Sequence, residues 1–229
     1  MSNGTLIEQR TIAVAELKPH PRNIEIYGDP RYSQDFGAFV QDVSENGIHP
    51  LIVADDMTII GGRYYAALQL GIAEVDATVY HYDSELDKLA ALIADNNQRV
   101  KSNWQIAEEA SALMEIAAAR AKERQSNSND YRADNSKQND SVSDTCHTPI
   151  NGRATDEVGS QLGISGRTVA DLTTVKDVVD ELIEFGLETE AQELIDEVNK
   201  NARKAADKAR KVRKQSEPNK PKKERAKDW

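Results

Sequence analysis

Hydrophobic and polar positions follow several distinct patterns along the first hundred residues of the chain. Residues 7–14 have the character of a β-strand, and the two prolines that follow end it. In residues 33–46 apolar side chains recur every three or four positions and a glycine follows, which predicts a helix. Short apolar runs predict further strands at 51–54, 58–60 and 75–82, with helices at about 63–70 and after Ser84. We therefore expect an α/β domain over residues 5–100.

The pattern changes after residue 100. Residues 101–125 carry apolar side chains on one helical face and predict a connecting helix. Residues 126–153 have almost no apolar side chains to offset the entropy lost on ordering, so they predict a polar, disordered linker. Helical periodicity returns at 154–176 and continues through 177–229, which is apolar at first and then basic. The predicted fold class is α+β, with an α/β amino-terminal domain, an all-α region and a long basic carboxy-terminal helix.

Composition narrows the class of protein. Charged residues make up 30% of the 229 residues and aromatic residues 5%, which suggests a core diluted by solvated helices, a linker or tails. The longest apolar run, residues 89–94, is too short for a membrane span, and the amino terminus lacks the pattern of a secretory signal. A single cysteine, Cys146, excludes an intramolecular disulfide and argues against a structural zinc site. We expect a cytoplasmic protein with no membrane partner.

The net charge of −10 is unevenly distributed along the chain. Residues 200–229 contain 13 Lys and Arg against 4 Asp and Glu, so the remainder of the chain is strongly acidic. A basic tail on an acidic body is a common way to hold phosphates. The alternative is a solvated tail that only aids solubility, and charge alone does not separate the two.

The sharpest local pattern lies in residues 155–172 and predicts two short helices joined by a glycine turn. Thr155 is a suitable N-cap, Gly163 supplies the positive φ of a tight turn, and Ser165 caps the second helix. The apolar residues of the inner face are Val158, Leu162, Ile164, Val169 and Leu172. This is the pattern of a helix-turn-helix, and the alternative is an ordinary helical hairpin.

The amino-terminal end of the second helix of such a motif enters the major groove of DNA. The residues that we expect to contact DNA are Ser165, Gly166, Arg167, Thr168, Ala170 and Asp171. Among them Arg167 is the best candidate for a bidentate contact with guanine, while the two hydroxyl side chains suit phosphate. A carboxylate at Asp171 on the exposed face is mildly unfavourable for DNA.

Two further segments carry candidate chemistry. Residues 59–64 read Ile-Ile-Gly-Gly-Arg-Tyr, a strand, a turn and a helix start, where backbone N–H groups and Arg63 suit an anion. Residues 95–99 read Asp-Asn-Asn-Gln-Arg and can hold a phosphate together with a hard cation. The alternatives are an ordinary glycine turn and a solvated polar helix end.

Together these segments resemble the ParB family. Residues 17–99 are similar to its amino-terminal domain, a fold shared with sulfiredoxin, and residues 155–172 to its helix-turn-helix. The polar segment is similar to stand-alone ParB-like proteins of phages, plasmids and mobile elements. In that family a Gly-x-Arg-Arg box and a Glu-Asn-x-Gln-Arg box line a pocket for CTP with magnesium. The resemblance implies nucleotide contacts from Gly61, Gly62, Arg63, Asn96, Gln98 and Arg99, and a metal held by Asp95 and Asn96.

The sequence departs from the ParB pattern at two of the quoted positions, and from the related sulfiredoxins at a third. Tyr64 stands in place of the second arginine, which removes one phosphate contact. Asp95 replaces the glutamate and is one methylene shorter, which changes its reach to a metal. Gly62 or Arg63 stands where sulfiredoxins carry their catalytic cysteine, which excludes that chemistry.

The sequence thus predicts a nucleoid-associated, sequence-specific DNA-binding protein of the ParB-like type, with a homodimer as one expected state. The nucleotide boxes add the option of regulation by nucleotide, in partition or in transcription. One alternative is a nucleotide hydrolase or nuclease that uses Arg63, Asp95, Asn96 and Arg99 around a metal-bound phosphate. Another is an adaptor scaffold whose carboxy-terminal helix recruits a partner protein.

Overall fold

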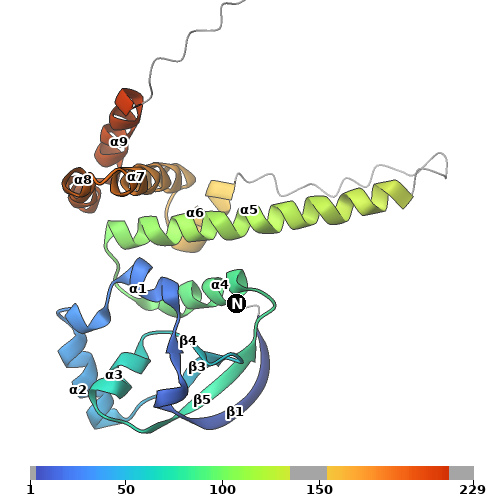
Figure 1. The fold of residues 1–229 in the computed structure, drawn as a ribbon, viewed down its shortest axis with the longest axis vertical. Coiled ribbons are helices and arrows are strands. Elements are labelled where there is room, and N and C mark those ends of the chain that lie inside the picture. The colour runs from blue at the N-terminus through green and yellow to red at the C-terminus, as the bar shows by residue number, and fades with distance from the viewer. Residues whose placement is uncertain (1–3, 135–153, 217–229) are drawn as a thin grey trace, which may run out of the picture. The chain divides into compact units, whose positions relative to one another are not determined.

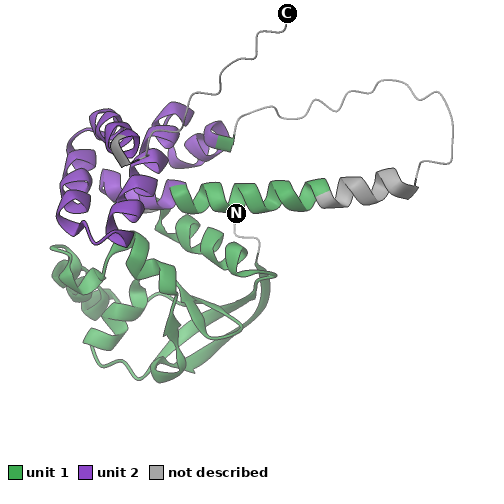
Figure 2. Cartoon of the chain, turned by 45° about the horizontal axis from the view of Figure 1, so that its top comes forward, with its two compact units in different colours: residues 1–101, 111–154 green, residues 102–110, 155–229 purple. Residues whose placement is uncertain are grey.

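The computed structural model describes residues 4–134 and 154–216, and the chain divides into two compact units (Figure 1). Unit 1 comprises residues 1–101 and 111–154, and unit 2 comprises residues 102–110 and 155–229 (Figure 2). No helix in the described residues is long and apolar enough to cross a membrane.

A five-stranded mixed sheet forms the centre of unit 1. Its strands are β1 (Thr5–Ala13), β2 (Lys18–Pro19), β3 (Leu51–Ala54), β4 (Thr58–Ile60) and β5 (Glu74–His81), in the spatial order β1-β5-β3-β4-β2. The pairs β1–β5 and β3–β4 are antiparallel, whereas β5–β3 and β4–β2 are parallel. Val53 of β3 and Ile59 of β4 are register partners, and both are fully buried. The apolar runs in the sequence are therefore the inner strands of the sheet.

Helices and short 3-10 turns accompany this sheet in unit 1, while most of β1 stays exposed. They are η1 (Val14–Glu16), α1 (Pro21–Tyr27), η2 (Pro30–Tyr32), α2 (Phe36–Asn46), α3 (Arg63–Gln69), α4 (Glu85–Asp95) and η3 (Asn96–Gln98). Figure 1 shows α1 and α4 together on one side of the strands. The mixture of sheet and helices confirms the expected fold class.

Helix α1 is absent from the sequence-based prediction, in which two prolines end a strand. Pro21 occupies the first helical position, where a missing N–H costs nothing. Nδ1 of His20 accepts a hydrogen bond from the N–H of Arg22 at 3.2 Å and caps the helix. The second proline therefore begins a helix rather than an irregular loop.

Unit 2 is all-α. Its helices are the start of α5 (Asn103–Asp134), α6 (Ala154–Leu162), α7 (Gly166–Glu184), α8 (Glu188–Lys200) and α9 (Ala202–Ser216). The core is formed by Ala107, Leu172, Val175, Val178, Val179, Leu182, Ala191, Leu194, Val198, Ala205, Ala206 and Ala209. Because every one of α7, α8 and α9 contributes to it, the segment after α7 is part of a folded domain.

Two expectations about helix lengths are wrong. Helix α5 continues to Asp134, beyond the predicted end at residue 125, because each added residue of an existing helix gains one hydrogen bond. The rest of the predicted linker, residues 135–153, lies outside the described residues. The single long basic helix is broken at Gly186, with φ +73°, and at Asn201, so that an acidic α8 precedes a basic α9. Residues 217–229 also lie outside the described residues.

Candidate functional site

The glycine turn after β4 and the polar end of α4 meet in unit 1. Gly61 is buried with a φ of +135°, and a methyl group on it would lie 2.5 Å from Oδ2 of Asp95. The carboxylate of Asp95, the last residue of α4, therefore packs directly on the turn that precedes α3. The two segments singled out in the sequence are neighbours in space.

The charge of this carboxylate depends on its surroundings. Burial raises the pKa of Asp95, and the positive charge of Arg63 at the start of α3 partly offsets that rise. Asn96 is buried, and its Nδ2 donates a hydrogen bond to the carbonyl of Leu92 at 2.9 Å. The amide nitrogen of Asn96 is thus committed to the helix end, which leaves the side-chain oxygen for a ligand.

The other residues predicted to contact a nucleotide follow Gly61 and Asn96 closely in the sequence. Gly62 is the residue before the first turn of α3, and a methyl group on it would meet no atom within 4 Å. Gln98 lies in η3, and its side chain is outside what the structure describes. The guanidinium of Arg99 lies 5.4 Å from the centroid of the Tyr27 ring at the end of α1. This cation–π contact favours a position of the Arg99 guanidinium over the Tyr27 ring.

Sequence reasoning missed a second arginine and its tyrosine. The guanidinium of Arg31 lies 5.8 Å from the ring centroid of Tyr65 in α3, and its Nε donates to Asp29 Oδ1 at 2.9 Å. The Tyr65 ring meets the ring of Tyr64 edge-on, with centroids 5.5 Å apart. The Asp29-Pro30 pair marks the start of this turn in the sequence, but only the fold reveals that Arg31 approaches α3.

A metal ion at this site would take most of its oxygen ligands from a bound nucleotide. In the described part of the chain, no three His, Cys, Asp or Glu side chains come together in a way that could hold a metal. Asp95 is the single carboxylate within residues 95–99. A hard cation needs about six oxygens, and the phosphates of a nucleotide are the natural source of the others.

In unit 2, α6 and α7 are joined by a tight turn at residues 163–165. Gly163 has a φ of +69°, and Oγ of Ser165 accepts a hydrogen bond from the N–H of Thr168 at 3.1 Å. A methyl group on Gly159 would lie 2.6 Å from the carbonyl oxygen of Ile164. The two helices therefore approach so closely that the backbone of the turn rests on a glycine of α6.

The first turns of α7 present most of the predicted DNA-contacting residues. Arg167 and Ala170 are exposed, and Arg167 has no ion pair among the described residues. The hydroxyl groups of Ser165 and Thr168 are 2.8 Å apart. Gly166 touches the carboxylate of Asp156 in α6, which a side chain at this position would overlap.

The expectation that Asp171 faces DNA is wrong. Asp171 is only 7% exposed, and its carboxylate pairs with the guanidinium of Arg210 on α9. Asp171 follows Arg167 by four residues and shares its side of α7, as the spacing indicates. However, α9 covers this side of α7 at Asp171, one turn after Arg167. The spacing of residues within α7 cannot predict a contact with a helix so distant in sequence.

Many cations of α9 are neutralised within unit 2. The ion pairs are Lys204–Glu197, Lys208–Glu193, Arg210–Asp171, Arg210–Asp207 and Arg213–Glu181. Arg203, Lys211 and Lys214 are exposed, have no ion pair in the region described, and share one face of α9 by their spacing. The positive surface of α9 is therefore narrower than its composition suggests.

Comparison with known proteins finds similarity in the fold but not in the sequence. No family model and no curated protein sequence matches the chain. Among solved structures, the C2221 form of the pNOB8-like ParB N-domain matches 95% of this chain and 88% of that chain, with a TM-score of 0.50 and 16% identity. The fold is ParB-like.

Two further structures are similar to this ParB-like chain. Another structure of the pNOB8-like ParB N-domain covers 87% of this chain and 75% of that chain, with a TM-score of 0.47 and 13% identity. The C-terminally truncated chromosome-partitioning protein ParB from Caulobacter crescentus, complexed to the centromeric parS site, covers 88% of this chain and 99% of that chain. Its TM-score is 0.39 and its identity 19%. The first match thus confirms the ParB resemblance at the level of the fold.

Proposed function

We propose that this ParB-like protein binds DNA sequence-specifically through α6 and α7, which act as a helix-turn-helix. The observation that carries the proposal is the division of α7 into two sides. Val169 and Leu172 are buried in unit 2, whereas Arg167 and Ala170 are exposed at the amino-terminal end of α7. In a helix-turn-helix this end enters the major groove, where an arginine without an ion pair can bind guanine.

The neighbours of Arg167 suit the DNA backbone. The hydroxyl groups of Ser165 and Thr168 lie at the capped end of α7, where they can donate to phosphate oxygens. Gly166 allows α7 to begin directly against Asp156 of α6, which fixes where these hydroxyl groups lie. Asp171 takes no part, because Arg210 holds it inside unit 2.

The experiment is a selection of bound sequences from a random duplex pool, followed by titrations on the selected and on a random duplex. We expect Arg167→Ala to weaken binding to the selected duplex by about 1–3 kcal/mol and to leave the random duplex nearly unchanged. Arg124→Ala, which removes an exposed arginine of α5, is the matched control. An equal loss on both duplexes would show that Arg167 does not read bases.

The exposed face of α9 supplies a second, sequence-independent contact in this proposal. Arg203, Lys211 and Lys214 lie on a packed helix, so their backbone positions are fixed before DNA arrives. Replacing all three with Gln should lower the slope of log K against log salt by up to about 2.7, at about 0.9 for each phosphate contact, on both duplexes. Lys122→Gln on α5 is the control. An unchanged slope would place α9 outside the DNA interface.

Nucleotide binding in unit 1 is a second proposed function, supported by the contact between Gly61 and Asp95. Arg63 provides a cation beside this contact, and Asp95 provides one oxygen ligand for magnesium. Arg99, whose guanidinium lies over the Tyr27 ring, is the second cation of the proposed site. These residues fit a triphosphate with its metal, and CTP is the nucleotide that the ParB resemblance implies. Tyr64 lacks the charge of the family's second arginine, so we expect weaker binding than a full set of cations would give.

Titration calorimetry with CTP, ATP, GTP and UTP, with and without magnesium, tests this second function. Arg63→Ala should weaken binding by about 1.5–3 kcal/mol, and Tyr64→Arg should strengthen it. Arg124→Ala serves again as the control. If no nucleotide binds the wild type at millimolar concentration, unit 1 has no nucleotide function.

We infer that the host process is partition or transcription and that the protein acts as a homodimer. Helix-turn-helix proteins commonly bind two half-sites as dimers, which supports the homodimer. Sedimentation of the protein with and without its selected duplex tests it. A complex with one protein chain on each duplex would contradict it.

A further inference from the structure

The turn between α7 and α8 exposes three apolar side chains within five residues. Ile183 is 51% exposed, Phe185 74% and Leu187 41%, and we call these three residues the α7–α8 tip. The backbone of the turn is well defined. The N–H of Gly186 donates to Ile183 at 3.0 Å and that of Leu187 to Leu182 at 2.8 Å, the two bonds of a Schellman motif. The apolar side chains are therefore held outward by an ordered turn.

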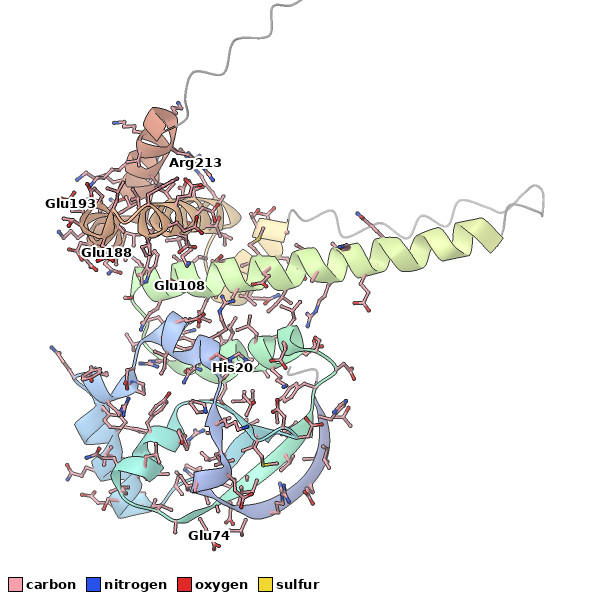
Figure 3. The ribbon with its side chains drawn as sticks, in the orientation of Figure 1. His20, Glu74, Glu108, Glu188, Glu193 and Arg213 are labelled. Carbon is pink, nitrogen blue, oxygen red and sulfur yellow. The ribbon has the colours of Figure 1, made fainter. Side chains whose placement is uncertain are left out.

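Carboxylates surround the tip. Glu184, Glu188 and Glu190 are exposed and have no ion pair among the described residues, whereas Glu193, further along α8, pairs with Lys208. Figure 3 labels Glu188 and Glu193 on α8. An apolar patch with an acidic rim suits a partner that has an aromatic anchor and positive charges. A second copy of the same tip would bring like charges together, so self-association through it is disfavoured.

The chain itself contains a segment with this chemistry. Residues 217–229 include five Lys and Arg, three Asp and Glu, and a tryptophan, Trp229, at the end. The net charge of this segment is therefore opposite to that of the rim.

The course of α9 brings this segment back along α8. Lys204 pairs with Glu197, and Lys208, one turn later, pairs with Glu193. As α9 proceeds, its partners therefore step back toward the start of α8, where the tip lies. Thirteen residues follow Ser216 and span up to about 43 Å when extended, whereas the whole of α8 is about 20 Å long.

We propose that residues 217–229 bind the α7–α8 tip of their own chain. Trp229 packs against Phe185, and the lysines of the segment lie beside Glu184, Glu188 and Glu190. The contact covers an apolar patch and neutralises its rim. It is independent of the functions proposed for unit 1 and for α7, since it uses none of their residues.

The two tryptophans of the chain, Trp104 and Trp229, allow a direct test. Incorporation of 5-fluorotryptophan into the full chain gives two 19F resonances, and Trp229→Phe assigns one of them. We expect the Trp229 signal of the wild type to be shifted from the position of free fluorotryptophan. Phe185→Ser should move it to the free position, and Glu188→Lys with Glu190→Lys or about 0.5 M NaCl should move it part of the way.

Two internal controls accompany this measurement. The Trp104 resonance should not move, because Trp104 packs on the core of unit 2 and thus reports whether that core is intact. Tyr32→Ser removes a side chain of unit 1 that is 88% exposed, and it should leave both resonances unchanged.

A Trp229 signal at the free position in the wild type would overturn the proposal. A shifted signal that ignores both Phe185→Ser and the charge reversals would also overturn it. If the shift disappears on dilution and sedimentation detects a dimer, the segment binds another copy, and the contact within one chain is wrong.

Discussion

The carboxylate of Asp171, on the helix that we propose reads DNA, is paired with the guanidinium of Arg210 on α9. The Asp171 side chain is 10% exposed and the Arg210 side chain 45%, so the pair lies at the edge of the core of unit 2. It attaches the basic helix to α7 one turn beyond Arg167. An acidic group that would repel phosphate is thereby removed from the proposed DNA-facing surface.

Loss of this pair should destabilise unit 2. Arg210→Ala leaves a buried carboxylate without its cation, and we expect the free energy of unfolding to fall by about 1–2 kcal/mol. The partial exposure of Arg210 keeps the loss below that of a fully buried pair. Lys208→Ala, which breaks the exposed pair with Glu193, should cost less than about 0.5 kcal/mol. Urea unfolding of both variants measures the difference, and equal losses would contradict the special role of Asp171.

Two helical glycines should respond to alanine with opposite signs. Gly→Ala inside a helix normally stabilises by up to about 1 kcal/mol. Gly37, in α2, has open space around it and should follow this rule. Gly159 should instead destabilise unit 2, because its new methyl group would lie 2.6 Å from the carbonyl oxygen of Ile164. Thermal unfolding of the two variants checks the signs, and stabilisation by Gly159→Ala would mean that α6 and α7 are less closely packed.

The adjacent glycines 61 and 62 should also differ. Gly61→Ala combines a φ of +135° with a contact to Asp95, and we expect a loss of about 2 kcal/mol or more. Gly62→Ala meets no atom within 4 Å at a φ of −100° and should change stability by less than about 0.5 kcal/mol. Chemical denaturation measures both. Similar values for the two variants would argue against close packing of Asp95 on the turn.

His20 should make stability depend on pH. Burial lowers the pKa of this imidazole, which is 4% exposed at the start of α1 and is labelled in Figure 3. Glu85 opposes that shift, and Lys88 reinforces it. The unfolded chain therefore binds a proton more readily than the folded one. The contribution of His20 is present above its ordinary pKa of 6.5 and is lost as the pH falls below that value.

The comparison variant for this effect is His20→Asn, which keeps an N-cap without a titrating group. Melting temperatures are measured for both proteins between about pH 8 and pH 5. We expect the wild type to lose stability relative to the variant as the pH falls, because a protonated Nδ1 can no longer accept from Arg22. Parallel curves would contradict this role of His20.

Local patterns predicted the elements whose boundaries are set by neighbouring residues. The strands at β3, β4 and β5 and the helices α2, α3 and α4 follow from apolar periodicity and from glycines at their ends. The turn at Gly163 and the cap at Ser165 were also predicted correctly. Such features depend on backbone dihedral angles and hydrogen bonds within a few residues, which the sequence shows directly.

Tertiary structure alone decided which side of each element is covered. The spacing in α7 identified Arg167 and Asp171 as neighbours, but only the packing of α9 shows that the second is buried. The two polar boxes were separate segments until the fold placed Asp95 on Gly61. A charge count described residues 200–229 as a basic tail, whereas three alanines on one face of α9 dock its first part in the core. Each of these outcomes depends on contacts between residues far apart in sequence, and hydrophobic burial drives them without leaving a local pattern.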